Sequence, residues 1–192
     1  MIEMRVRGKV ERFLDPAGAF LAKLGFTPTW LTFLGLGLTL TGAFLVANKY
    51  LVTGALVALG GSALDGLDGA VARSRGTASA SGSLVDSVAD RIGETAMWAG
   101  LTFAVAETPR LTLLCVLSLG AALLVSYLRA KAESIGIDGR GGLMGRAERV
   151  ILLTFGLLFF SLIEWVLWAM VILTWITVFQ RFIRSWRQLE KA

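Results

Sequence analysis

The chain has 192 residues, of which 55% are hydrophobic and only 17% are charged, and its formal net charge is +5. This apolar fraction excludes an ordinary soluble domain, and it predicts an all-α membrane protein because the charged residues lie between long apolar runs. The sequence contains no His, so imidazole is excluded as a catalytic base or metal ligand. Because the basic residues flank apolar segments, we expect anionic lipid headgroups and phosphorylated substrates as partners, and no nucleic acid.

The first 29 residues are basic and amphipathic, with a kink at Pro16, and they are typical of an interfacial helix in the lipid headgroup region. Six apolar segments of spanning length follow, at 30–47, 51–72, 83–106, 111–132, 149–163 and 165–183. One long helix over the last two segments is the alternative, but it would exceed what a bilayer needs. The predicted fold is a single membrane domain over residues 1–192, in which an amphipathic helix precedes a bundle of six transmembrane helices.

The distribution of basic residues predicts the orientation of these spans. All but two of the 19 Lys and Arg residues fall on one side of a six-span arrangement, and the exceptions are Lys49 and Arg110. Because positively charged segments remain in the cytoplasm, we expect both termini and the segment 73–91 to be cytoplasmic. The protein is therefore predicted to be a multi-pass protein of the cell membrane.

Four Asp residues carry the strongest chemical signal. They form two pairs, which are Asp65 with Asp68 and Asp86 with Asp90. Spacings of three and four residues place each pair on one face of a helix. An uncompensated carboxylate beside an apolar run costs about 2.5–3.5 kcal/mol, and divalent cations bound through oxygen are the simplest compensation. We predict a two-metal site at the membrane surface, where a carboxylate is the most available base because His is absent.

Small and basic residues surround these pairs. Gly69 would let a ligand approach the backbone closely, and Arg73 supplies a permanent cation suited to phosphate. A salt network between the aspartates and neighbouring arginines is the alternative interpretation. Four carboxylates at these spacings, with glycines on the same helix faces, favour the metal site.

The same stretch resembles the signature of the CDP-alcohol phosphotransferase family, D-x2-D-G-x2-A-R-x8-G-x3-D-x3-D. Every fixed position of that signature is present, at Asp65, Asp68, Gly69, Ala72, Arg73, Gly82, Asp86 and Asp90. The resemblance implies magnesium-dependent transfer of a phosphatidyl group from a CDP-linked lipid to an alcohol, with release of CMP. It also implies a homodimer and a donor that is either CDP-diacylglycerol or the archaeal ether lipid CDP-archaeol.

The resemblance further implies roles for individual residues. One magnesium ion would be held by Asp65, Asp68 and Asp86, and a second by Asp65, Asp86 and Asp90. Manganese is the alternative ion, and Asp90 would also be the catalytic base. The implied donor-binding residues are Thr29, Thr32, Gly69, Arg73 and Ser79. For Thr29, a helix N-cap is an equally good interpretation.

A second basic cluster bears on the acceptor alcohol, and its members are Arg129, Lys131, Arg146, Arg149 and Arg181. Guanidinium groups from different helices suit an acceptor that already carries a phosphate. The pattern resembles phosphatidylinositol-phosphate synthases and their archaeal ether-lipid counterparts, although Lys is common in that branch where Arg129 stands. The resemblance implies inositol phosphate as the acceptor and this cluster as the contact to its phosphate. Anchoring by positive charge alone is the alternative role.

Two other functions remain open from the sequence. Glycerol phosphate is the rival acceptor, in a reaction of the phosphatidylglycerophosphate-synthase type. A divalent-cation transporter is the alternative of another class, but its carboxylates would be expected near the midplane of the bilayer rather than toward the cytoplasmic ends of the helices. Release of CMP from CDP-diacylglycerol is expected of the enzyme and not of the transporter, so it distinguishes the two functions.

Overall fold

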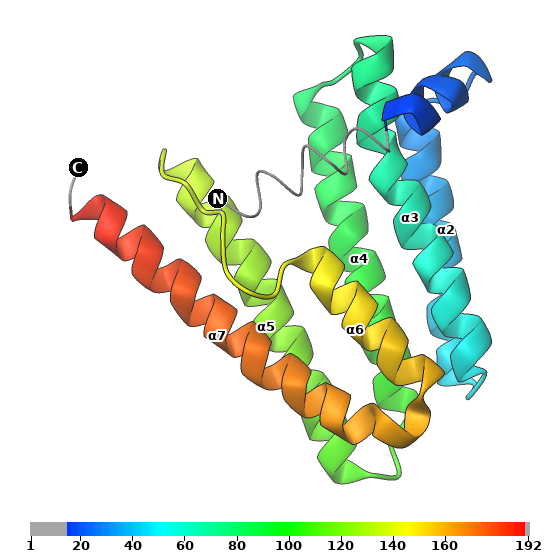
Figure 1. Ribbon diagram of the computed structural model, residues 1–192, viewed down its shortest axis with the longest axis vertical. Helices are drawn as coiled ribbons and strands as arrows, with labels where there is room; N and C mark the ends of the chain where they lie inside the picture. The colour runs from blue at the N-terminus through cyan, green and yellow to red at the C-terminus, as the bar shows by residue number, and fades with distance from the viewer. Residues whose placement is uncertain (1–14, 191–192) are drawn as a thin grey trace. The chain divides into compact units, whose positions relative to one another are not determined.

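The computed structural model describes residues 15–190, and the regular structure within this range is helical (Figure 1). Residues 15–23 form a short helical segment. The helices that follow are α2 (Pro28–Ala47), α3 (Leu51–Arg75), α4 (Ala80–Ala104), α5 (Pro109–Ser134), α6 (Arg146–Leu158) and α7 (Ile163–Leu189), with the 3-10 turn η1 (Phe160–Leu162) before the last. The all-α prediction is confirmed. Residues 1–14 of the predicted amphipathic helix lie outside the described range.

The six predicted apolar segments correspond to α2–α7, and the largest differences concern the last two: α6 ends five residues earlier than predicted and α7 continues six residues further. α6 ends at Leu158 and α7 begins at Ile163, so the prediction of two helices rather than one is confirmed. The sequence predicts the break at residues 162–165 with Glu164 as the turn residue, whereas the structure has it earlier, at residues 159–162. Glu164 therefore lies in the first turn of α7, because η1 makes the reversal instead.

Within residues 15–190, four segments are long and apolar enough to cross a membrane, namely α2, α3, α5 and Phe160–Leu189, which joins η1 to α7. α4 falls short in hydropathy because charged side chains interrupt it, among them Asp86 and Asp90. α6 has 13 residues; at 1.5 Å per residue it spans about 20 Å, against a hydrocarbon core of roughly 30 Å. Length and composition thus support four of the six predicted spans.

Large apolar side chains are exposed along these helices. Phe44, Phe103 and Trp165 are 68%, 73% and 75% exposed. Extended apolar surface is unfavourable in water but suits contact with lipid acyl chains. Together with the four apolar helices, this surface indicates a membrane protein.

The described chain divides into two compact units. The first unit holds the described residues up to Val46 together with Thr53–Met97. The second holds Ala47–Val52 and the described residues from Trp98 onward. All four predicted metal ligands belong to the first unit, and the second basic cluster belongs to the second unit.

Two glycine pairs bring α2 against α3 in the first unit. A Cβ atom on Gly35 would lie 2.7 Å from the carbonyl oxygen of Gly61, and one on Gly61 would lie 2.5 Å from that of Gly35. The same reciprocal contact joins Gly42 and Gly54, at 2.6 and 2.7 Å. The residue numbers of the paired glycines rise along α2 and fall along α3, so the two helices are antiparallel. Their backbones touch at both glycine pairs.

The helical segment 15–23 is attached to the C-terminal end of α3. A Cβ atom on Gly18 would lie 2.5 Å from the nearest side chain of α3, so the two backbones are close here. Arg73 pairs with Asp15 at 2.8 Å, and Arg75 donates a hydrogen bond to a carbonyl of the segment at 3.1 Å. Both arginines therefore tie the segment to the helix that carries two of the predicted metal ligands.

In the second unit, α7 packs against α5 and α6. A buried cluster of Ala121, Val125 and Val178 forms part of the α5–α7 contact. At the other end of α7, Glu164 pairs with Arg110 of α5 at 3.0 Å. Gly156 of α6 has no room for a side chain, because its Cβ would lie 2.8 Å from a methyl group of α7. The second unit is thus organised around α7.

We expect Gly61→Ala to lower the midpoint of thermal unfolding in detergent. The added methyl group would lie 2.5 Å from the carbonyl oxygen of Gly35, and overpacking of this kind costs about 1–3 kcal/mol. Gly60→Ala is the matched control, because among the described residues no atom beyond the neighbouring backbone of α3 lies within 4 Å of its Cβ position. Equal midpoints for the two variants would contradict the glycine contact.

Candidate active site

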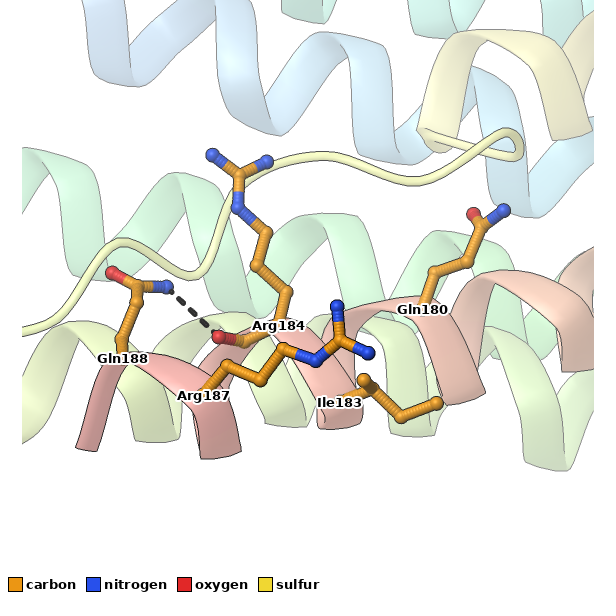
Figure 2. Close-up of a pocket in the computed structure, with 5 residues that line it drawn as sticks. All are labelled: Gln180, Ile183, Arg184, Arg187 and Gln188. Atoms are coloured by element: carbon orange, nitrogen blue, oxygen red, sulfur yellow. Dashed lines mark hydrogen bonds between the residues drawn. The ribbon is translucent and has the colours of Figure 1, made fainter. Parts of the chain in front are cut away.

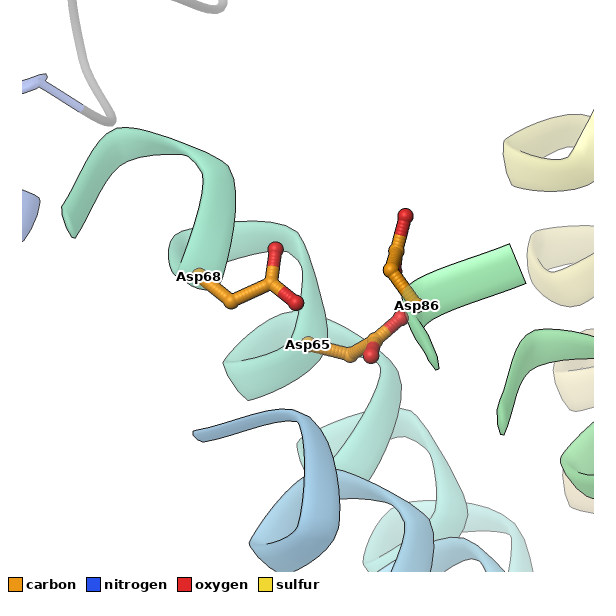
Figure 3. Close-up of side chains that lie close together, drawn as sticks. All are labelled: Asp65, Asp68 and Asp86. Atoms are coloured by element: carbon orange, nitrogen blue, oxygen red, sulfur yellow. The ribbon is translucent and has the colours of Figure 1, made fainter. Parts of the chain in front are cut away.

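Three of the four predicted aspartates converge in the first unit. One carboxylate oxygen from each of Asp65, Asp68 and Asp86 lies within 4.8 Å of the other two. Figure 3 shows Asp65 and Asp68 extending from α3 beside Asp86 of α4. The spacing of three residues on α3 places the first two on one face of that helix, as the sequence predicts. Asp65 is buried, and the other two are half-buried.

The chemistry of this group suits a hard divalent cation. All three side chains offer carboxylate oxygens, which are the ligands that magnesium, manganese and calcium prefer. Three like charges within 4.8 Å repel one another, and partial burial strengthens the repulsion because water screens it less. A bound divalent cation offsets both costs, so the residues present fit a divalent metal site.

Asp90 lies outside this group of three. It follows Asp86 by one turn of α4, and its Oδ2 is 3.4 Å from Nη2 of Arg91. The same guanidinium contacts Glu94 at 2.9 Å, and the side chains of Asp90 and Glu94 are only 13% and 12% exposed. Asp90 thus belongs to a largely buried ion cluster beside the metal site. Its predicted roles as a ligand and as a base stay predictions.

A pocket of about 480 Å³ lies beside the carboxylates. It is bounded by the start of α2, the end of α3, the α3–α4 connection and the start of α4, and Asp68 and Asp86 line it. All five predicted donor-binding residues also line it, namely Thr29, Thr32, Gly69, Arg73 and Ser79. The fold therefore gathers these residues in one place, and their contact with a donor stays a prediction.

Thr29 is not the N-cap of α2. The helix begins at Pro28, and the backbone N–H of Trp30 donates to Oγ1 of Thr27 at 3.3 Å. Thr is a favoured N-cap residue and Pro is favoured at the first helical position. The N-cap interpretation of Thr29 is therefore wrong because Thr27 fills that role.

Four polar residues that line this pocket were not predicted to bind the donor, and they are Thr27, Arg75, Thr77 and Ser83. The Thr-Pro pair at the start of α2 could have identified Thr27 as a cap. Arg75 gives no such signal, since basic residues are common in the last turn of a helix. With Arg73 it supplies two guanidinium groups to one pocket, which suits a ligand with more than one phosphate.

The second basic cluster separates into exposed and buried members. Arg129 is exposed and pairs with Glu133 one turn away at 3.0 Å. Lys131 is exposed and Arg146 is half-buried at the start of α6. Arg149 and Arg181, in contrast, are only 3% and 8% exposed. Anchoring at lipid headgroups needs exposed side chains, so this alternative does not account for the two buried arginines.

The buried arginines bind backbone carbonyl groups of the second unit. Arg149 donates to the carbonyl of Met144 at 3.2 Å. Arg181 donates to the carbonyl of Gly141 and to that of Val125, both at 2.8 Å. A buried guanidinium needs such partners to offset its loss of hydration. Both residues therefore help to fix the connection between α5 and α6.

The C-terminal part of α7 also fixes this connection. Figure 2 shows a shallow pocket there, lined by Gln180, Ile183, Arg184, Arg187 and Gln188. Arg184 pairs with the carboxylate of Asp138 at 3.1 Å, and Gln188 donates to the carbonyl of the same residue at 2.9 Å. The sequence gives no signal for these contacts, because they join residues about 50 positions apart.

The fold and the carboxylate group together define a class, that of membrane-associated helical proteins with a divalent-metal site beside a polar pocket. The family model for CDP-alcohol phosphatidyltransferase matches residues 26–179. The chain therefore belongs to the CDP-alcohol phosphatidyltransferase family, and the predicted membership is confirmed. The predicted enzyme class is confirmed with it.

Individual members of the family are similar to this chain over most of its length. The archaetidylinositol phosphate synthase of Methanothermobacter thermautotrophicus is 35% identical, over 96% of this chain and 94% of that protein. The crystal structure of Mycobacterium tuberculosis phosphatidylinositol phosphate synthase with CDP-DAG bound is 30% identical with a TM-score of 0.83, covering 91% of this chain and 94% of that one. The same enzyme in complex with manganese and citrate gives a TM-score of 0.83 at 30% identity, covering 90% and 88%. The predicted resemblance to phosphatidylinositol-phosphate synthases is confirmed.

We expect Asp86→Asn to weaken Mn²⁺ binding by roughly tenfold or more, because it removes one of three charged ligands. The measurement is titration of free Mn²⁺ by electron paramagnetic resonance with the protein in detergent. Glu107→Gln is the control, since this carboxylate has a 91% exposed side chain and lies in the second unit. Unchanged affinity in Asp86→Asn would remove Asp86 from the metal site.

Proposed function

We propose that the chain transfers a phosphatidyl group, or its ether-lipid equivalent, from a CDP-linked lipid to inositol phosphate and releases CMP. The observation that carries the proposal is the group of three aspartates beside a pocket lined by all five predicted donor-binding residues. The family membership and the relatives named for archaetidylinositol and phosphatidylinositol phosphate synthesis support the same reaction. The donor is CDP-diacylglycerol or CDP-archaeol.

The metal site would take two magnesium ions, with manganese as a substitute. Asp65, Asp68 and Asp86 would hold one ion, and Asp65, Asp86 and Asp90 the other. When bound, the ions supply charge stabilisation to the reacting phosphate groups. The manganese complex of the related enzyme supports a divalent cation in this family.

The chain's own residues would bind the donor and carry the proton. Arg73 and Ser79 would contact the diphosphate, and Gly69 would let the nucleotide approach α3 closely. Asp90 would accept the proton of the acceptor hydroxyl while the oxygen of that hydroxyl forms a bond to the lipid-linked phosphorus. The bond from that phosphorus to the CMP oxygen breaks in the same displacement, and CMP leaves.

The acceptor would carry its own phosphate, bound by the second basic cluster. Arg149 and Arg181 are suited to this role because their backbone hydrogen bonds hold them in defined positions. A guanidinium that is fixed in advance loses little conformational freedom when phosphate binds. Arg129, Lys131 and Arg146 would add positive charge nearby.

The chain would form one integral-membrane domain with six spans, an interfacial segment over residues 1–29 and both termini in the cytoplasm. The active site would open to the same side. The protein would act as a homodimer.

A panel of acceptors tests the proposed reaction. We expect purified protein with Mg²⁺ and one CDP-lipid to release CMP with inositol phosphate at least tenfold faster than with glycerol phosphate, free inositol or serine. A preference for glycerol phosphate would identify glycerol phosphate, rather than inositol phosphate, as the acceptor. Cation flux in liposomes without any CMP release would favour a transporter.

We expect Arg149→Ala to raise the KM for inositol phosphate by roughly tenfold or more, with little change in the KM for the CDP-lipid, because it removes a charge-assisted contact to the acceptor. Arg187→Ala is the control, since this side chain lies exposed on α7. Steady-state kinetics with each substrate varied in turn supplies both constants. An equal rise in the two KM values would count against an acceptor site at Arg149.

A further inference from the structure

Thr32 lies where the donor pocket meets the metal site. Its side chain comes from the first turns of α2, it lines the pocket, and the residue is only 3% exposed. The hydroxyl Oγ1 is 2.6 Å from Oδ2 of Asp68, and 3.2 Å from the carbonyl oxygen of Pro28. The one polar group of this buried side chain therefore has two acceptors within reach.

The hydroxyl of Thr32 donates its hydrogen bond to the carboxylate of Asp68. A hydroxyl has a single hydrogen to donate, and hydrogen bonds to ionised acceptors are shorter and about twice as strong as those to neutral ones. The 2.6 Å contact to Asp68 has the length of such a charge-assisted bond, whereas the 3.2 Å contact to Pro28 is long for a hydroxyl donor.

The glycine crossing of α2 and α3 holds Thr32 in place. Gly35 lies one turn after Thr32, and a Cβ on Gly35 would meet the backbone nitrogen and the Cβ of Asp65 at 3.1 and 3.2 Å. The backbones of the two helices are thus in contact at Asp65 itself, beside the other carboxylates. The hydrogen bond is therefore fixed by backbone contact on both sides rather than by a flexible loop.

We propose that Thr32 is a positioning residue for the metal site, because its hydroxyl holds one oxygen of Asp68 and leaves the other directed to the cation. The inference rests on the proposed function in one respect, that Asp68 is a metal ligand. It differs from the donor contact that the family resemblance implies for Thr32. A hydroxyl that is committed to Asp68 acts on metal affinity before any donor is bound.

Removal of the hydroxyl separates these roles. We expect Thr32→Val, which keeps the shape of the side chain, to weaken Mn²⁺ binding by roughly tenfold without donor present, as loss of a group that orients a metal ligand does. Thr32→Ser keeps the hydroxyl and should bind Mn²⁺ within about twofold of the original protein. The measurement is the same electron paramagnetic resonance titration in detergent.

Matched variants make the outcome decisive. Thr41→Val removes an exposed hydroxyl of the same helix whose acceptor within residues 15–190 is the carbonyl of Gly37, at 2.8 Å, and it should leave Mn²⁺ affinity unchanged. Thr32→Ala provides a second hydroxyl-free variant if Thr32→Val does not elute as a folded protein in size-exclusion chromatography. Both variants should show the same loss.

Two results would overturn the inference. If Thr32→Val binds Mn²⁺ normally and instead raises the KM for the CDP-lipid, Thr32 contacts the donor and does not position Asp68. If the original protein binds no Mn²⁺ at all, the metal site itself is wrong, and the proposed function fails together with the inference. The original protein's own titration therefore distinguishes the two failures.

Discussion

The backbone contact between α2 and α3 is the constraint on which the active site depends. Glycines at both crossings let the two antiparallel helices touch, and no side chain separates them near Asp65. This closeness buries Asp65 and brings Thr32 of α2 within hydrogen-bond distance of Asp68. A wider crossing would open the carboxylates to water and remove the second helix from the site. The glycines thus determine the geometry of the carboxylates and of the Thr32 hydroxyl, although they contribute no side chain to the site.

Buried charge is handled differently in the two units. In the first unit, three carboxylates gather with like charges close together, an arrangement that favours a divalent cation as its partner. In the second unit, Arg149 and Arg181 are buried and donate hydrogen bonds to backbone carbonyl groups, which offset part of their loss of hydration. The predicted metal ligands and donor-binding residues thus belong to the first unit, and the predicted acceptor-binding residues belong to the second.

Much of the site could be predicted from sequence, because it depends on local spacing. Helical periodicity places Asp65 and Asp68 on one face, and hydropathy identifies the segments that become α2–α7. Contacts between distant residues could not be predicted in this way. The pairing of Arg184 with Asp138 depends on how a loop without periodicity folds along α7. The short length of α6 depends on the turn at residues 159–162, which contains no Gly or Pro that would predict it. The bond from Thr32 to Asp68 depends on how α2 packs against α3.

The central claim is that the aspartates of α3 and α4 hold divalent metal beside the pocket for the nucleotide-linked lipid. Anomalous diffraction from crystals soaked in Mn²⁺ tests it most directly. We expect an anomalous peak in contact with Asp65, Asp68 and Asp86, and a second peak in contact with Asp65, Asp86 and Asp90. Peaks located elsewhere, or three aspartates that bind no ion at saturating Mn²⁺, would contradict it.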